Sequence, residues 1–366
     1  MSAAATPPPP PLQAPERLLA DFDARKPAAL ARAVSIVENR REGFEQLLAA
    51  LHPRLGRARR LGITGPPGAG KSTLTTQLAA LWREREHTVG IVAVDPTSPF
   101  TGGALLGDRI RMESVALDPG IFIRSMATRG SLGGLAATTR DVADVLDAFG
   151  FDRILIETVG VGQSELDIAR TADSSVVVLV PESGDSIQTM KAGLMEIADI
   201  FVVNKSDRPG ADRMRHELEL MLGLRMGQIF RSIPAHHGVD LGRPANPAKA
   251  ARLAAAAPDH TEWTPPVLAT VAQRGEGIVE VSDALDRHLD YLERSGTLRQ
   301  RRRERLRERV VEVVEREVRR RLWKHAGTGA WLDDQLGALE SGSATPFGVA
   351  GELLRRSENL LTRADA

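Results

Sequence analysis

Residues 65–72 read GPPGAGKS and match every fixed position of the phosphate-binding pattern G-x-x-x-x-G-K-[ST]. The glycines allow backbone N–H groups to turn inward around phosphate oxygens, and a following helix directs the positive end of its dipole at them. The lysine of such a segment, here Lys71, reaches the β- and γ-phosphates, while the hydroxyl of Ser72 binds Mg²⁺. A nucleoside triphosphate site is therefore predicted. We expect it to be lined by Gly65, Pro66, Pro67, Gly68, Ala69, Gly70, Lys71, Ser72 and Thr73.

A second segment, Asn204-Lys205-Ser206-Asp207, indicates which base is bound, and it directly follows the apolar run IFVV. This is the N-K-x-D pattern of GTP-binding proteins. The carboxylate of Asp207 can accept hydrogen bonds from N1 and from the exocyclic amino group of guanine, whereas adenine offers no matching pair of donors. Because a buried acceptor without a donor costs free energy, the pattern predicts selection of guanine over adenine. The predicted base-binding residues here are Asn204, Lys205 and Asp207.

A third segment, Val271-Ala272-Gln273, is predicted to close over the base, and Gly275 and Gly277 follow it. A strand end followed by a glycine turn has the same sequence pattern, and the sequence leaves both interpretations open.

Regular elements must position these segments, and short apolar runs that alternate with helical stretches supply them from about residue 60 onward. The predicted strands are Leu61–Thr64, Val89–Val94, Ile121–Ile123, Ile154–Ile156, Val176–Val180, Ile200–Val203 and Val267–Val271. Near-continuous apolar runs are typical of a parallel sheet whose two faces are both covered. The predicted fold class is α/β, a P-loop domain with a mostly parallel, doubly wound sheet, flanked by N- and C-terminal α-helical extensions.

The predicted organisation has four parts. Residues 1–15 contain five consecutive prolines and form a disordered tail, and residues 16–57 form an arm of two or three helices that breaks near Arg40 to Gly43. Residues 58–285 form the nucleotide-binding domain, in which residues 232–266 are an insertion rich in Pro, Ala and His. A C-terminal helical arm, residues 286–366, completes the chain.

The composition excludes several classes of function. The 366 residues include 48 Lys+Arg and 48 Asp+Glu, so no overall charge favours nucleic acid or an acidic substrate. The absence of cysteine excludes disulfides and thiol catalysis, and it makes a surface loop the favoured interpretation of His236 and His237. Apolar runs stay far short of the roughly 20 residues that span a bilayer. The first residues resemble neither a signal nor a transit peptide, so a cytoplasmic protein is expected.

Two stretches between the phosphate and base segments have the character of nucleotide-dependent switches. Residues 95–112 start with Asp95 at a strand end and continue as a long glycine-containing loop. In residues 156–165, Glu157 follows the run ILI at the position of the acid that serves the metal site in P-loop proteins. Gly160 comes next, with the flexibility to sense the γ-phosphate.

Together these segments closely resemble the MeaB/ArgK-type GTPases, the chaperones of adenosylcobalamin-dependent acyl-CoA mutases such as methylmalonyl-CoA mutase. The matching segments are GPPGAGKST, VDPTSPFTGGALLGDRIRM, RSMATRGSLGGLA, ETVGVGQSE, PESGDSIQTMKAGLMEIAD and NKSD, which cover most of residues 60–207. The resemblance implies a homodimeric, Mg²⁺-dependent GTPase that binds GTP and GDP and meets adenosylcobalamin only through its partner. After Asp207 the chain departs from the family in its longer insertion and in a long C-terminal tail. It also has Val271 where the family usually has a serine, so contacts with the base there would be made by backbone N–H groups.

The resemblance also implies a set of acids around Mg²⁺. Asp95, Asp108 and Glu157 would approach the ion directly or through water, beside the Ser72 hydroxyl. For Asp108, which precedes a helix start, helix capping is a rival interpretation.

Further roles implied by the resemblance concern catalysis and signalling. Residues 181–191 would form a third switch, in which Asp185 and Lys191 relay the nucleotide state to the partner. Gln163 could orient the attacking water, although its place three residues past Gly160 differs from the spacing in small signalling GTPases. The predicted catalytic residues are thus Lys71, Asp95, Glu157 and Gln163.

One long helix is predicted from Leu298 to Trp323. Its apolar residues at i+4 spacing are Leu306, Val310, Val314, Val318 and Leu322. Residues 299–324 include twelve basic and five acidic side chains, which could bind nucleic-acid phosphates. Pairs such as Glu317 and Arg321 are instead typical of a solvated helix face. A dimerisation arm is favoured, as the resemblance also implies, and a surface for an acidic partner is the next alternative.

The resulting hypothesis is a GTP hydrolase whose cycle gates cofactor loading, or removal of damaged cofactor, at a cobalamin-dependent mutase. A P-loop small-molecule kinase is an alternative, but the N-K-x-D pattern and the switch-like loops oppose it. A metal-insertion GTPase for another metalloenzyme is a second alternative, and the lack of cysteine for a metal relay opposes that one. Which acyl-CoA mutase is served does not follow from the sequence.

Overall fold

The computed structural model describes residues 15–95, 112–127, 134–158, 168–181, 192–225, 263–324 and 327–357. The chain divides into two compact units, Met1–Arg299 and Gln300–Ala366. The first unit holds one sheet with its covering helices, and the described part of the second unit is helical.

The sheet has the strand order β3-β2-β4-β1-β5-β6-β7, and all of its pairings are parallel. The strands are β1 (Arg59–Thr64), β2 (Val89–Asp95), β3 (Ile121–Ala127), β4 (Arg153–Thr158), β5 (Ser174–Leu179), β6 (Ile200–Asn204) and β7 (Val267–Thr270). Each strand predicted from the sequence is present, and the parallel α/β fold is confirmed. Because β1 lies between β4 and β5, the segments that follow β1 and β4 emerge as neighbours at the carboxyl ends.

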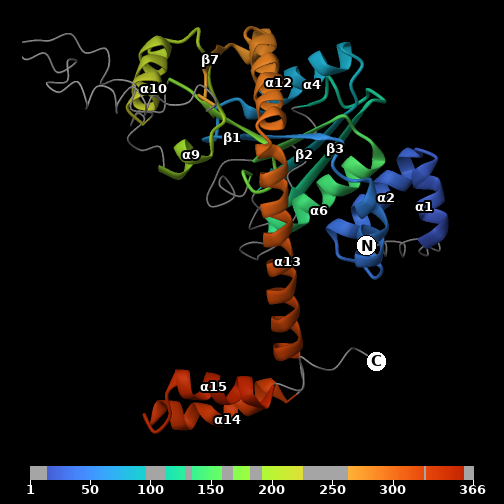
Figure 1. Cartoon of the computed structure of the whole chain (residues 1–366), viewed down its shortest axis with the longest axis vertical. Helices are drawn as coiled ribbons and strands as arrows, with labels where there is room; N and C mark the ends of the chain where they lie inside the picture. Colours follow the sequence, from blue (N-terminus) through green and yellow to red (C-terminus); the bar gives the residue numbers. More distant parts are fainter. Residues whose placement is uncertain are drawn as a thin grey trace, which may run out of the picture. The chain divides into compact units, whose positions relative to one another are not determined.

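Helices cover both faces of this sheet (Figure 1). The chain moves from β1 toward the β3 edge and later from β3 back to β4, so right-handed crossovers place the connecting helices on opposite faces. The α4 face is covered by α4 (Lys71–Glu84) and α12 (Ile278–Arg294). The α6 face is covered by α6 (Gly134–Phe149), α9 (Ala192–Ile197) and α10 (Ala211–Arg225). This double cover leaves every residue of β4 and β5 buried.

Three helices precede the sheet, within the two or three that were predicted. They are α1 (Pro15–Asp23), α2 (Pro27–Glu38) and α3 (Phe44–Leu51), followed by the short η1 (His52–Arg54). The break falls where it was predicted, with φ values of 45° at Arg40 and 83° at Gly43. The apolar sides of these helices pack against α6, and Phe22 meets Phe149 edge-on at 5.0 Å.

One carboxylate holds the connection between these helices and β1. The side chain of Asp147, at the end of α6, accepts hydrogen bonds from the N–H groups of residues 56–58 at 2.9–3.1 Å and from Arg60 at 2.8 Å. Burial alone would lower the pKa of the Arg60 guanidinium, but the carboxylates of Asp144 and Asp147 outweigh burial and raise it. The start of β1 is therefore fixed, and β1 is the strand that ends at the phosphate segment.

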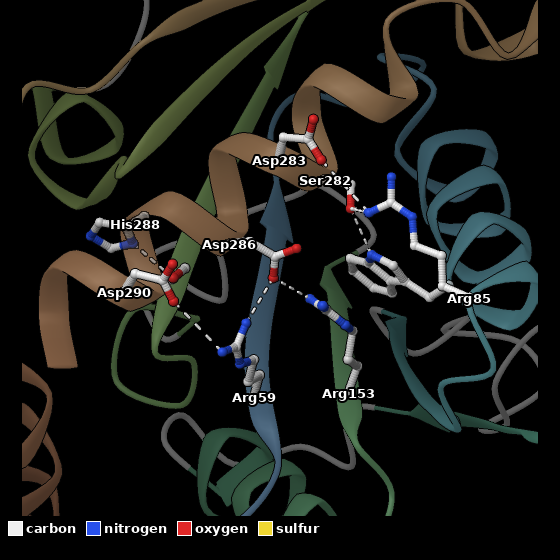
Figure 2. Close-up of polar contacts among 10 residues, drawn as sticks. Arg59, Arg85, Arg153, Ser282, Asp283, Asp286, His288 and Asp290 are labelled. Atoms are coloured by element: carbon white, nitrogen blue, oxygen red, sulfur yellow. Dashed lines mark hydrogen bonds and ion pairs between the residues drawn. The ribbon is translucent and has the colours of Figure 1, made fainter.

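Polar contacts also fasten α12 to the amino ends of the strands (Figure 2). Asp286 accepts a hydrogen bond from Arg59 of β1 at 2.8 Å and pairs with Arg153 of β4 at 2.9 Å. Ser282 accepts a hydrogen bond from the indole N–H of Trp82 in α4 at 2.9 Å. These contacts lie at the opposite end of the sheet from residues 65–72, so they anchor a helix and take no part in the nucleotide site.

The C-terminal helices are α13 (Thr297–Lys324), α14 (Thr328–Glu340) and α15 (Pro346–Arg356). The long helix predicted between Leu298 and Trp323 is thus confirmed as α13. Across the described ranges, no helix combines the length and the apolar character needed to cross a membrane.

Helix α13 exposes its apolar stripe. The exposed fractions are 48% for Leu306, 63% for Val310 and 54% for Val314, and none of the residues of α13 is buried. The predicted pair of Glu317 and Arg321 is present at 2.8 Å. Hydrogen bonds from the arginines three and four residues further on lower the pKa of Glu317 to about 2. The charged face of α13 is therefore solvated, and its apolar residues are exposed as well.

Candidate nucleotide-binding site

The phosphate segment turns sharply between the end of β1 and the start of α4. Gly65, Gly68 and Gly70 have φ values of 138°, 75° and 87°, a region that glycine enters without a steric penalty. A side chain at Gly65 would also lie 2.1 Å from the carbonyl oxygen of Val178. Pro67 and Gly68 are exposed. The outer rim of the loop is therefore open to a ligand.

Lys71 lies inside this loop. Its ammonium group donates hydrogen bonds to the carbonyl oxygens of Gly65 at 2.7 Å and Pro66 at 2.9 Å, and the residue is 5% exposed. Helix α4 begins at Lys71, and its N-cap residue is Gly70, which has no side chain to bind the first N–H groups. A positive charge and helix N–H groups thus share the place to which the sequence pattern assigns the phosphates.

Beside the lysine, Ser72 and Glu157 form the oxygen-rich part of the site. The Ser72 hydroxyl donates a hydrogen bond of 2.5 Å to Glu157 Oε1, and Glu157 is 1% exposed on β4. Hydroxyl and carboxylate oxygens suit Mg²⁺, which takes its other ligands from waters and phosphates. The donor set therefore fits this ion. The described residues contain no group of three or more His, Cys, Asp or Glu side chains that could hold a metal by themselves.

A single amide connects the three predicted nucleotide segments. Asn204, which is 3% exposed at the end of β6, donates from Nδ2 to the carbonyl oxygen of Ala69 at 2.8 Å. Its Oδ1 accepts hydrogen bonds from the Thr270 hydroxyl at 3.0 Å and from the Ala272 N–H at 3.1 Å. The phosphate loop, the base segment and residues 271–273 are therefore held in one fixed arrangement.

The base segment presents a carboxylate to solvent. Lys205 has a φ of 56°, and the Ser206 N–H donates to the Thr270 carbonyl oxygen at 3.0 Å. These contacts place Asp207 at the rim, with a side chain that is 41% exposed and whose Oδ2 lies 3.7 Å from Arg274 Nη2. The carboxylate can therefore receive hydrogen bonds from a ligand that enters from solvent.

The third segment lies next to the base segment in the short helix η3 (Ala272–Arg274). Val271 and Ala272 are buried, whereas Gln273 is exposed. The N–H of Ala272 is already donated to Asn204. The N–H of Val271 likewise donates to the carbonyl oxygen of Glu276 at 3.1 Å. Two of the backbone donors that we expected for this segment therefore serve the architecture of the site.

Several predicted residues lie outside the described part of the chain. Asp95 is the last residue of β2, and Ala93 of the same strand pairs with Glu157. The backbone of Asp95 therefore lies at the same carboxyl end of the sheet as Glu157. The side chain of Asp95 is not described. Also outside the described residues are Asp108, Gly160, Gln163, Asp185, Lys191, His236, His237, most of the predicted insertion and residues 1–14.

Two residues of the site, Thr270 and Arg274, were not predicted from the sequence. Thr270 carries a hydroxyl that fixes Asn204, and the two residues pair across β6 and β7. A threonine at one strand end opposite an asparagine at the next is a recognisable cross-strand pair, so the signal was present. Arg274, which approaches Asp207, gave no such signal, because the contact depends on how distant segments fold together.

The glycines of the loop allow a matched test of this arrangement. A β-carbon at Gly70 would lie 2.3 Å from Asn204 Nδ2, whereas one at Gly68 would meet no atom within 4 Å. Both positions have positive φ, so alanine costs about 1–2 kcal/mol of backbone strain at either. Gly70→Ala must also displace Asn204. We expect it to lower the free energy of unfolding of the nucleotide-free protein by about 2 kcal/mol more than Gly68→Ala does, as measured by urea denaturation. Equal losses would contradict the bridging role of Asn204.

Comparison with known proteins shows which protein family this chain is similar to. Residues 30–327 match the family model described as "Methylmalonyl Co-A mutase-associated GTPase MeaB". A protein of Pyrococcus abyssi that carries the provisional name of a GTPase is 50% identical over 286 residues, which are 78% of this chain and 79% of that protein. The GTPase ArgK of Escherichia coli is 33% identical over 87% of this chain and 89% of its own length.

Two further similarities extend the comparison. A mouse protein, the mitochondrial methylmalonic aciduria type A homolog, is 31% identical over 90% of this chain and 76% of its own length. Among solved structures, a LAO/AO transport system kinase is 27% identical with a TM-score of 0.64, and the match covers 95% of this chain and 98% of that one.

Proposed function

This chain belongs to the MeaB family of methylmalonyl-CoA mutase-associated GTPases, and from that premise we propose that it is a Mg²⁺-dependent GTP hydrolase and the chaperone of an adenosylcobalamin-dependent acyl-CoA mutase. One observation carries the proposal. A phosphate-binding loop and a guanine-type base segment meet at the side chain of Asn204, which supports GTP as the ligand. The family name supports a mutase as the client.

In this proposal the residues at the carboxyl ends of β1 and β4 carry out the chemistry. Lys71 binds the β- and γ-phosphates and stabilises the charge that builds up as phosphate leaves. Ser72 and Glu157 hold Mg²⁺, with Asp95 and Asp108 as further acids. When bound, the ion would supply positive charge that offsets the negative charge of the phosphate groups. Because phosphoryl transfer depends mainly on positioning and charge, the protein needs no covalent intermediate.

The remaining predicted residues take supporting roles. The NKSD segment and residues 271–273 hold guanine. Gln163 orients the attacking water, and Gly160 contacts the γ-phosphate. Asp185 and Lys191 relay the nucleotide state to the client.

The GTPase cycle is proposed to act on the client protein. GTP binding and hydrolysis gate the loading of adenosylcobalamin or the removal of damaged cofactor, which this chain meets only through the mutase. Intrinsic hydrolysis is slow and speeds up when the client completes the site, as happens when other GTPases meet activating partners. We place this cycle in the cytoplasm.

GTP hydrolysis by the purified protein tests this function, alone and with each cobalamin-dependent acyl-CoA mutase from the same source. Free phosphate and any phosphorylated acceptor are measured together, which separates hydrolysis from the kinase alternative. We expect one mutase to raise kcat at least about tenfold. A high rate without response to any mutase would contradict the chaperone role, and a phosphorylated acceptor would contradict hydrolysis itself.

We also propose that α13 joins two copies of this chain through its apolar stripe. Leu306, Val310 and Val314 follow one another at i+4, and a continuous exposed stripe of this kind is typical of an interface. The double variant Val310→Asp/Val314→Asp is expected to convert a dimer into a monomer in sedimentation velocity. The control is Val279→Asp, which changes a valine on α12 that is 47% exposed. A dimer that survives the double variant would place the interface elsewhere.

A further inference from the structure

Two buried hydroxyl groups meet where β1 and β4 end. Thr64 is the last residue of β1, Thr158 is the last residue of β4, and their hydroxyl oxygens are 2.9 Å apart in a hydrogen bond. The residues are 0% and 3% exposed. The last main-chain pair recorded between the two strands is Ile63 with Glu157. The hydroxyl pair therefore continues the pairing by one residue where the strands separate.

At this strand end, successive side chains point to opposite faces of the sheet. Side chains alternate along a strand, and Leu155 of β4 packs on the α4 face while Ile156 packs on the α6 face. Glu157 accordingly points to the α4 face, where it meets Ser72. Thr158 points to the α6 face. The metal-site acid and its hydroxyl neighbour thus hold the same strand end from opposite sides.

The next described part of the chain also rests on β1. Ile168 is 2% exposed, and its side chain lies so close to Gly62 that a β-carbon there would be 2.6 Å from Ile168 Cγ1. Gly62 and Thr64 are alternate residues on one face of β1. The strand that leads into the phosphate loop therefore anchors residues on both sides of the stretch 159–167.

We propose that the Thr64–Thr158 hydroxyl pair is a positioning device that holds Glu157 at the metal site; this inference rests on the proposed function. Glu157 is the penultimate residue of β4, where the main-chain pairing with β1 ends while the pairing with β2 continues to Thr158. The hydroxyl bond ties the residue after Glu157 to the strand that carries the phosphate loop. The distance between Glu157 and Ser72 is thereby set by β1. Residues that hold a metal ligand in position, without touching the metal, affect the affinity for the metal.

The test replaces each hydroxyl by a methyl group of similar shape. We expect Thr158→Val and Thr64→Val each to raise the Mg²⁺ concentration for half-maximal GTP hydrolysis by about tenfold and to lower kcat by a similar factor. The second readout is the binding of a fluorescent GDP analogue, with Mg²⁺ and with chelator. Affinity in chelator should change by less than about twofold, while the gain from Mg²⁺ should shrink. Thr158→Ser, which keeps the hydroxyl, should restore both readouts.

A double variant and a matched control sharpen the test. Thr64→Val/Thr158→Val should resemble either single variant, because both changes remove one bond. Thr139→Val is the control, since that residue is 3% exposed on α6 and its hydroxyl has no hydrogen-bond partner among the described residues. If Thr158→Val does not fold, Thr64→Val breaks the same bond from the other strand.

Three results would overturn the inference while leaving the proposed function intact. The first is an unchanged Mg²⁺ dependence in the valine variants. The second is an equal loss of GDP affinity with and without Mg²⁺, which indicates a purely structural role. The third is an equal effect of Thr139→Val. If the unaltered protein neither binds GDP nor hydrolyses GTP, the proposed function itself is wrong.

Discussion

Replacing Lys71 with alanine is expected to lower kcat for GTP hydrolysis by about 10²–10³-fold, the usual cost of removing one preorganised charge-stabilising group. The ammonium lies within the phosphate loop, held by the carbonyl oxygens of Gly65 and Pro66. When GTP enters, this charge is already in place and requires little reorganisation. Single-turnover hydrolysis with excess protein measures the chemical step directly.

Two further variants test whether the effect is specific to the lysine at position 71. Arginine keeps the charge, but its planar group is larger than an ammonium and cannot fit between the same two carbonyl oxygens, so we expect it to fail as well. Lys26→Ala removes a lysine whose side chain is 60% exposed and should leave kcat unchanged. Near-normal hydrolysis by Lys71→Ala would remove this loop from the proposed chemistry.

Much of the fold could be predicted because its signals are local. The runs that became β4 and β5 are apolar along their whole length, and burial on both faces requires this. The order of the strands could not be predicted in the same way. Placement of β4 between β1 and β2 rests on pairs such as Arg59 with Arg153, which are far apart in the sequence. No short window contains that information.

The same division applies to the site. The sequence pattern placed Lys71 at the start of α4 and Asp207 after β6, because a turn and a helix start depend on neighbouring residues. The direct bond between Ser72 and Glu157, and the bridge from Asn204 to the phosphate loop, appear only when distant strands come together. Helix α13 shows a related limit. Its periodicity predicts a helix, but it does not predict what covers the apolar face, which is exposed among the described residues.

Changing Asp207 to asparagine should alter which base is bound. The carboxylate offers two acceptor oxygens, which match N1–H and the exocyclic amino group of guanine. Asparagine replaces one oxygen with an NH₂ group, so a donor of the ligand would face a donor of the protein. Sites built to match a donor pattern discriminate strongly, and we expect the affinity for GTP to fall by at least about a hundredfold. Isothermal titration calorimetry of each nucleotide with the unaltered protein and with the variant measures this change.

Xanthosine triphosphate provides the decisive arm of that experiment. Xanthine keeps N1–H but carries a carbonyl oxygen where guanine has its amino group, so it matches the acceptor and donor of asparagine. Asp207→Asn should therefore bind this nucleotide more tightly than GTP. Asp212→Asn is the matched control, because the fully exposed Asp212 lies nearby on α10 and no base contact is proposed for it. If Asp207→Asn weakens both nucleotides equally, the carboxylate supports the loop without reading the base. Reversal of the preference would instead place Asp207 in contact with the purine, because only direct hydrogen bonding distinguishes an amino group from a carbonyl oxygen at that position.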